Sequence, residues 1–189
     1  MLERVLSMGV QAPAATLETV DEGRLGAVVG EHFEVLWRFM HRLGLAEGDV
    51  DDAVQEVIVV LARKLDQVQA GSERAFVLST AFRVASEFRR RTRRRREVDD
   101  SSLAQLQSTD HDPESRLTQK RLRGLLQQVL RELPIELRAV FVLYELEELT
   151  MAEIATTLGL PPGTVASRLR RARETFEKLA GVALKEHEP

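Results

Sequence analysis

The stretch TMAEIATTLGLPPGTVASRLRRAR, residues 150–173, most constrains the fold, because its start, its corner and its second half each favour a defined local structure. Thr150 followed by Glu153 is a capping box, in which each residue satisfies an amide donor at a helix start. Gly159 stands at the corner, where glycine takes a positive φ without steric strain. The Pro-Pro pair that follows suits the first turn of a new helix. The sequence therefore predicts two helices joined by a tight turn, a helix-turn-helix.

The second of these helices has an apolar face and a basic face at helical spacing. Its apolar residues are Val165, Leu169, Ala172, Phe176 and Leu179. Its outward and flanking residues are Thr164, Ser167, Arg168, Arg170, Arg171, Arg173 and Glu174. A helix of this kind fits the DNA major groove, where arginines reach phosphates and guanine edges. The alternative is a solvated basic helix in an ordinary bundle, but the coincidence of cap, corner glycine, apolar stripe and basic face favours DNA binding.

Composition argues against several kinds of site. The chain has no cysteine, which excludes disulfides, thiolate zinc sites and cysteine nucleophiles. Its four histidines are scattered without ligand spacing, so we expect no metal and no cofactor. The sequence shows neither a signal peptide nor an apolar run long enough to cross a bilayer, so we expect no membrane insertion and a cytoplasmic protein.

The net charge of −3 conceals a strong segregation of charge along the chain. Seven arginines lie between Arg89 and Arg96, and acidic residues collect at 47–56 and 97–114. This asymmetry favours a polyanionic partner. The arginine run is alternatively a solvated tail, but it continues a helix with an apolar stripe and so presents guanidinium groups to a phosphate backbone.

Helical periodicity recurs along the chain and no stretch alternates with a period of two, so we predict an all-α protein of two small helical domains. We expect a mobile N-terminal segment at 1–23, a first helical domain at 24–97, a flexible acidic linker at 98–113 and a second helical domain at 114–184. Within the first domain, helices are predicted near 25–43, 49–65 and 73–96, with a loop at Leu65–Ser72. In the second, helices precede and follow Leu133-Pro134 before the helix-turn-helix.

With these blocks in order, the chain resembles a bacterial sigma factor of the extracytoplasmic-function (ECF) group within the sigma-70 family. LPIELRAVFVL and the helix-turn-helix that follows resemble region 4 of the family and are the more specific part. DDAVQEVIVVLARKL resembles regions 2.1–2.2, and ERAFVLSTAFRVASEFRRR resembles regions 2.3–2.4.

The resemblance implies a promoter-specificity subunit that binds core RNA polymerase, through its clamp helices and flap, and promoter DNA. It also implies an anti-sigma factor as a partner, and neither an enzymatic activity nor a small-molecule substrate. The implied polymerase contacts are Asp51, Asp52, Gln55 and Glu56. The loop Leu65–Ser72 would capture an unpaired base of the −10 element. The implied −10 contacts are Phe76, Arg83, Ser86, Glu87, Arg90, Arg91 and Arg94, and the implied −35 contacts are Thr164, Ser167, Arg168, Arg170, Arg171 and Arg173.

The chain departs from the family pattern at several of these positions. Phe76 replaces a common tryptophan, Arg83 a common asparagine and Glu87 a common aspartate, so the −10 contacts are less closely matched than the −35 contacts. Glu148 stands where a glycine usually precedes the helix-turn-helix, and a positive φ there would cost ~1 kcal/mol. Ala166 stands where Lys or Arg is frequent, so the −35 preference cannot be copied from relatives.

Three other functions compete with transcription initiation as explanations of the sequence. An operator-binding regulator would use the first domain as a sensor or dimerisation domain. An adapter would bind polymerase without DNA. An enzyme is disfavoured, because the sequence offers no Gly-rich phosphate loop and no plausible nucleophile.

Overall fold

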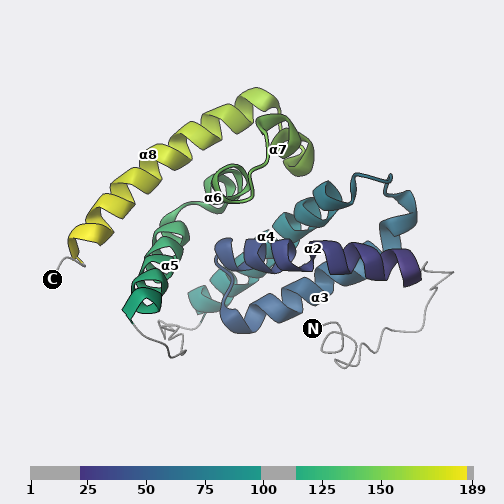
Figure 1. Cartoon of the computed structure of the whole chain (residues 1–189), viewed down its shortest axis with the longest axis horizontal. Helices are drawn as coiled ribbons and strands as arrows, with labels where there is room; N and C mark the ends of the chain where they lie inside the picture. Colours follow the sequence, from purple (N-terminus) through teal and green to yellow (C-terminus); the bar gives the residue numbers. More distant parts are fainter. Residues whose placement is uncertain (1–21, 99–113, 187–189) are drawn as a thin grey trace.

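The computed structural model describes residues 22–98 and 114–186, and every regular element in those two ranges is a helix. Most of the predicted N-terminal segment and of the predicted linker lies outside the described residues. The described helices form two groups, one on either side of residues 99–113 (Figure 1). The predicted all-α class with two small helical domains is confirmed.

The first group contains α2 (Glu22–Arg42), α3 (Glu47–Lys64) and α4 (Glu73–Val98), each of which packs on the other two. A short 3-10 turn, Leu65–Gln67, follows α3. The predicted apolar stripes face inward: Phe39 and Met40 on α2, Ala53 on α3 and Ala81 on α4 are fully buried. Gly44 ends the first of these helices with a φ of 81°, a conformation that glycine adopts without strain.

The second group contains α5 (Glu114–Glu132), α6 (Ile135–Phe141), α7 (Met151–Leu158) and α8 (Pro162–Glu186). Helix α8 packs along α5, α6 and α7, and the rings of Phe141 and Phe176 stack between α6 and α8 with centroids 4.7 Å apart. The interior side chains Val165, Leu169 and Ala172 of α8 are buried, as their spacing predicts.

Some helix boundaries differ from those predicted. Helix α2 begins at Glu22, three residues before the expected position 25, and α3 begins at Glu47, two residues before the expected Asp49. The helix that follows Leu133-Pro134 is α-helical only to Phe141 and then widens into a π-helical turn, Val142–Leu146. After that turn Glu148 takes a φ of 57°, so the unfavourable positive φ considered from the sequence does occur.

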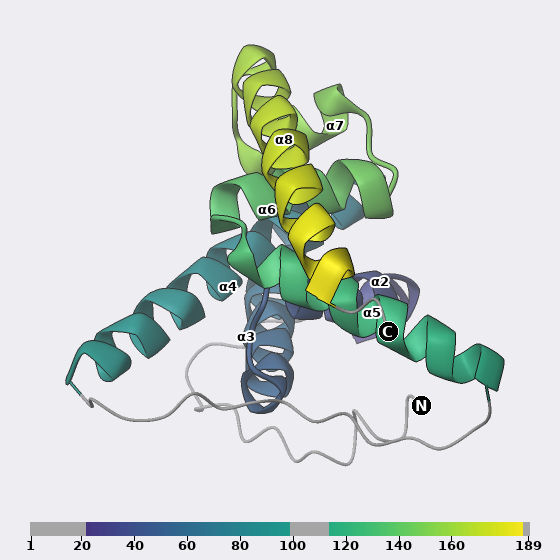
Figure 2. The ribbon, with the colours of Figure 1, turned by 90° about the vertical axis from the view of Figure 1, so that its left-hand side faces the viewer.

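The two groups are docked on one another (Figures 1 and 2): α7 packs on α4, and α5 contacts α2. Arg138 of α6 lies at this junction and is fully buried. Its guanidinium donates to the carbonyls of Leu43 (2.5 Å) and Leu133 (2.8 Å) and also to that of Arg131. Arg89 of α4 donates to the same Leu43 carbonyl at 3.0 Å. Burial lowers the pKa of Arg138 to about 9, so its charge is retained at neutral pH.

Candidate nucleic-acid interface

The predicted helix-turn-helix is present with the local chemistry expected of it. The Thr150 hydroxyl accepts from the backbone N–H of Glu153 (3.3 Å), and the Glu153 carboxylate accepts from the backbone N–H of Thr150 (2.7 Å), which completes the capping box. Hydrogen bonding from Thr150 lowers the pKa of Glu153. Gly159 closes α7 with φ 63° and ψ 38°, and the N–H of Leu160 returns to the Ala155 carbonyl at 2.9 Å. These contacts fix the angle at which α8 leaves the corner.

Helix α8 presents most of its predicted DNA-facing residues to solvent. Ser167, Arg170, Arg171 and Arg173 are exposed, whereas Thr164 and Arg168 are half-buried on the flanks. Several are already engaged within the chain. The Ser167 hydroxyl donates to the Thr164 carbonyl (3.0 Å), and Arg170 pairs with Glu174 (2.7 Å).

Arg173 is held more firmly than its neighbours on the helix. It pairs with Glu145 of the π-helical turn at 2.6 Å and lies over the Tyr144 ring, 5.1 Å from the centroid. The hydrogen bond with Glu145 raises the pKa of Arg173. A phosphate or base edge would therefore have to compete with a carboxylate for this guanidinium. Arg171 has no such carboxylate partner among the described residues.

The predicted −10 residues are spread along α4. Arg83, Arg90, Arg91 and Arg94 are exposed, and Phe76, Ser86 and Glu87 are half-buried. Glu87 pairs with Arg90 at 2.6 Å and Arg91 at 3.3 Å, and hydrogen bonding from Arg90 lowers its pKa. The side chains of Arg93, Arg95 and Arg96 lie outside the described residues.

A groove between α3 and α4 brings some of these residues together with others that the sequence did not single out. Arg83 and Glu87 line it from α4, along with Thr80 and Val84. Glu56, Val60, Arg63 and Lys64 line it from α3. Glu56, which was predicted on the polymerase-binding face, therefore lies beside the predicted −10 residues, and Phe76 does not line the groove.

The predicted base-capturing loop, Leu65–Ser72, is anchored by a residue that the sequence did not reveal. Leu65 and Val68 are buried. Arg24 of α2 donates to the carbonyls of Leu65 (2.9 Å) and Val68 (2.7 Å), and also to the Glu73 carboxylate (2.9 Å). These contacts join residues more than 40 positions apart, for which no local motif exists, so periodicity alone could not have found them.

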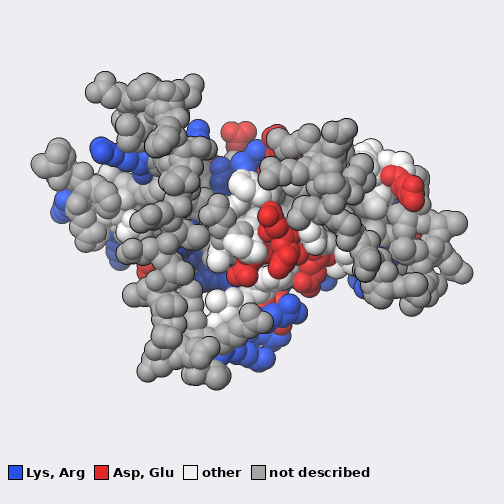
Figure 3. Space-filling model, turned by 90° about the horizontal axis from the view of Figure 1, so that it is seen from below, with Lys and Arg blue, Asp and Glu red and all other residues white. Residues whose placement is uncertain are grey.

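The predicted polymerase-binding residues lie along α3. Asp51 and Asp52 are exposed, and Gln55 and Glu56 are half-buried. The molecule seen from below has acidic side chains gathered near its centre, with Lys and Arg around them (Figure 3). Such a face suits a partner that presents basic groups.

The described residues also set limits on the kind of site the chain can form. Across residues 22–98 and 114–186, no cluster of three or more His, Asp or Glu side chains could hold a metal ion. None of the described helices is both long and apolar enough to cross a bilayer.

Part of the second helical group matches a known family model, and about three quarters of the chain aligns with known relatives. Residues 123–176 match the family described as Sigma-70, region 4. The chain is 32% identical over 148 residues to the ECF RNA polymerase sigma factor SigE of Mycolicibacterium smegmatis, a match covering 78% of this chain and 58% of that protein. It is 28% identical over 155 residues to the ECF RNA polymerase sigma-E factor of Escherichia coli, covering 74% of this chain and 81% of that protein.

Two solved structures are similar in fold. One is the sigma factor RpoE in complex with the anti-sigma factor NepR from Bartonella quintana, with a TM-score of 0.60, 25% identity and coverage of 85% of this chain and 96% of that one. The other is CnrH in complex with the cytosolic domain of CnrY, with a TM-score of 0.63, 23% identity and coverage of 85% and 90%.

Proposed function

Because this chain belongs to the ECF group of the sigma-70 family, we propose that it is a transcription initiation factor that binds core RNA polymerase and directs it to specific promoters. On this proposal it reads the −35 element through α8 and opens the −10 element through α4. It works by binding alone, with no covalent chemistry of its own, and it acts where promoter DNA is, in the cytoplasm.

The observation that carries this function is the exposed outer face of α8 behind a capped, glycine-cornered turn. Ser167 and Arg171 point into solvent from a helix whose opposite face is buried. A helix held in this way can enter a major groove with its side chains already aimed at base edges, and Arg171 has the length to reach guanine. Thr164, Arg168, Arg170 and Arg173 would complete the −35 contacts.

The first helical group supplies the −10 function in this proposal. Capture of an unpaired base requires its unstacking, which costs a few kcal/mol and is offset by a shaped or stacking site. The anchored loop Leu65–Ser72 and the groove beside Arg83 and Glu87 offer such a site. Arg90, Arg91 and Arg94 would then hold phosphates along the exposed side of α4. Phe76 at the start of α4 and Ser86 at its middle would complete the −10 contacts.

Two protein partners follow from the same proposal. Asp51, Asp52, Gln55 and Glu56 would dock on the polymerase clamp helices, and the second domain would contact the flap. An anti-sigma factor is the other partner, since the RpoE structure from Bartonella quintana is a complex with the anti-sigma factor NepR.

We place the domains at 24–97 and 114–184, with a linker at 98–113 between them.

Run-off transcription with purified core polymerase over a randomised promoter library tests this function directly. We expect initiation at a small set of sequences that share a −35 and a −10 motif. Arg171→Ala should relax the −35 motif while core binding persists. If core polymerase gains no promoter-specific initiation from this protein, the operator-binding regulator becomes the better account.

A further inference from the structure

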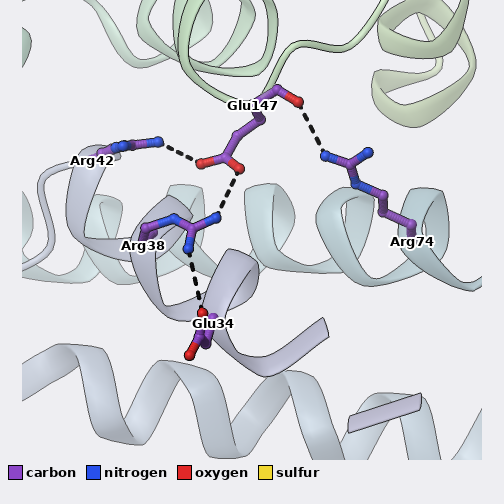
Figure 4. A network of polar contacts seen from close by, with 5 residues as sticks. All are labelled: Glu34, Arg38, Arg42, Arg74 and Glu147. Atoms are coloured by element: carbon purple, nitrogen blue, oxygen red, sulfur yellow. Dashed lines mark hydrogen bonds and ion pairs between the residues drawn. The ribbon is translucent and has the colours of Figure 1, made fainter. Parts of the chain in front are cut away.

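Glu147 is a buried acid at the junction of the two helical groups, and no local sequence pattern indicates its burial. It follows the π-helical turn of the second group, and its side chain is 3% exposed. Its carboxylate accepts from Arg42 at 2.5 Å and from Arg38 at 3.4 Å, both on α2 of the first group (Figure 4). Its backbone carbonyl accepts from Arg74 of α4 at 3.0 Å. One residue of the second group is therefore held by three arginines from two helices of the first.

The backbone on either side of Glu147 fixes its direction. Its own N–H donates to the Val142 carbonyl at 3.0 Å, and Glu148 follows with a φ of 57°. This left-handed turn costs a non-glycine residue ~1 kcal/mol or more. Arg38 is held in turn by Glu34, 3.7 Å away on the same helix (Figure 4). The backbone therefore directs the Glu147 carboxylate toward α2. There it meets the Arg38 guanidinium, which Glu34 holds in place.

The docked arrangement cannot reach both elements of a promoter at once. By their positions the −35 and −10 elements lie about 25 base pairs apart, which is ~85 Å along duplex DNA at about 3.4 Å per base pair. A compact body of this chain length has a radius of gyration of about 16 Å. The two groups must therefore separate if each is to bind its own element.

The chain can accommodate that separation. Fifteen residues lie between the end of α4 at Val98 and the start of α5 at Glu114. Fully extended, a segment of this length spans ~50 Å. The covalent connection therefore does not hold the groups together, and the contacts between them must.

We propose that Glu147 is an electrostatic latch that keeps the helix-turn-helix group docked on the first group in the free protein and is released when polymerase and promoter are engaged. The inference rests on the proposed function, because only a two-element promoter requires the groups to separate. Glu147 suits this role better than the apolar contacts around it. A buried carboxylate that loses its arginine partners is strongly unfavourable, so partial opening is resisted. Once the groups are fully apart, the same charged side chains are solvated again, so the open state does not contain a buried unpaired charge.

The test measures the distance between the two groups in the free, full-length protein. The chain has no cysteine, so Glu31→Cys on α2 and Lys178→Cys on α8 introduce two exposed and unique labelling sites. Double electron–electron resonance between spin labels should give one short, narrow distance distribution. Glu147→Gln should raise the undocked population at least about tenfold, since it removes one partner of a buried ion pair.

Glu145→Gln is the matched control, because it removes an acid two residues away whose partner, Arg173, lies in the same helical group. It should leave the distance distribution unchanged. Circular dichroism checks that the helices of each variant persist. Should Glu147→Gln fail to fold, the double variant Arg38→Gln/Arg42→Gln opens the latch from the more exposed side, where the two side chains are 46% and 21% exposed.

Two outcomes would overturn the latch. The first is a distance distribution that neither Glu147→Gln nor the double arginine variant alters. The second is a short distance that persists in a promoter complex active in run-off transcription. The measurement on the free protein needs neither polymerase nor DNA, so loss of the proposed function would appear in the transcription assay alone.

Discussion

Gly44 and Arg138 meet at the docked junction so closely that a Cβ atom at position 44 would overlap Nη1 of the arginine. Gly44 ends α2 with a φ of 81°, and Arg138 comes from α6 of the other helical group. The glycine therefore has two roles that can be separated, one conformational and one steric. It permits the left-handed turn, and it leaves room for a buried guanidinium to reach the Leu43 carbonyl.

Gly44→Ala should destabilise the protein more than a positive φ alone explains. The left-handed conformation costs an alanine ~1–2 kcal/mol. Displacement of Arg138 leaves buried carbonyls short of a donor, at a further ~1–3 kcal/mol. Urea unfolding should show a loss of about 2–5 kcal/mol. Gly71→Ala is the matched control, because Gly71 has a φ of 87° and a Cβ there would meet nothing within 4 Å. Equal losses for the two variants would refute the steric role.

Glu148→Gly should stabilise the protein, in the opposite direction to most substitutions. Glu148 is the one described residue other than glycine with a positive φ, 57°. Glycine relieves ~1 kcal/mol of strain there. The melting temperature should rise by a few degrees, as expected for a change of that size. Gly159→Ala, at a φ of 63° with open space around it, is the reverse control and should lower it. A lower melting temperature for Glu148→Gly would show that the side chain itself stabilises the junction.

Local features of this fold were predictable, and contacts between distant segments were not. The capping box at Thr150, the corner at Gly159 and the buried stripe of α8 depend on residues a few positions apart, so spacing reveals them. The ion pair between Arg42 and Glu147 joins positions 105 residues apart. Nothing in the local sequence indicates that Glu147 is buried while its neighbour Glu148 is exposed.

The candidate site was predictable to a similar degree. Helical periodicity identified the exposed face of α8, including Ser167 and Arg171. Periodicity could not show that Arg173 is held by Glu145, because that carboxylate comes from the π-helical turn. A π-helical turn changes the direction in which the following side chains point, so regular α-helical spacing does not predict them. The groove that joins Glu56 to Arg83 and Glu87 depends on how α3 packs on α4. Which of the predicted residues contact DNA or polymerase stays a prediction.

The capping box should make stability depend on acid pH. The pKa of Glu153 is lowered in the folded protein, chiefly by hydrogen bonding from Thr150. A carboxyl with a lowered folded pKa stabilises the protein above its unfolded pKa, near 4.5, and loses that contribution as the pH falls through the folded value. Glu153→Gln should therefore lower stability at neutral pH, and the difference from the native protein should disappear as the pH falls through the lowered folded pKa of Glu153. Thermal melts of both proteins between pH 3 and 7 measure the difference, and a constant offset across that range would contradict it.

The exposed arginines of α4 should set the salt dependence of binding to −10 DNA. If Arg90, Arg91 and Arg94 each neutralise a phosphate, their joint replacement by Gln should reduce the slope of log K against log salt by roughly 2–3. Fluorescence anisotropy over a series of salt concentrations measures that slope. The control removes three exposed cations elsewhere, with Arg121→Gln, Arg123→Gln and Lys178→Gln, and should leave the slope nearly unchanged. An unaltered slope in the α4 variant would show that these three arginines do not contact phosphates.

Arg171 should contribute to sequence specificity at the −35 element, and not only to electrostatic attraction for DNA. Among the residues that the structure describes it makes no ion pair, whereas Arg170 and Arg173 each hold a carboxylate. Its guanidinium is therefore available to a base edge without breaking an internal contact. Arg171→Ala should weaken −35 binding by ~1–3 kcal/mol and relax the preference at one base position.

Lys178→Ala is the control that separates the effect of losing a positive charge from the effect of losing a base contact. Lys178 is an exposed cation two turns further along the same face of α8, so its loss removes equal charge. It should leave the base preference intact when both variants are assayed against a set of single-base changes in the −35 element. A uniform loss of affinity across all sequences for Arg171→Ala would make Arg171 a phosphate contact, because a phosphate has the same charge beside every base. In that case specificity would have to come from Thr164, Ser167 or Arg168, which lie nearer the start of the helix.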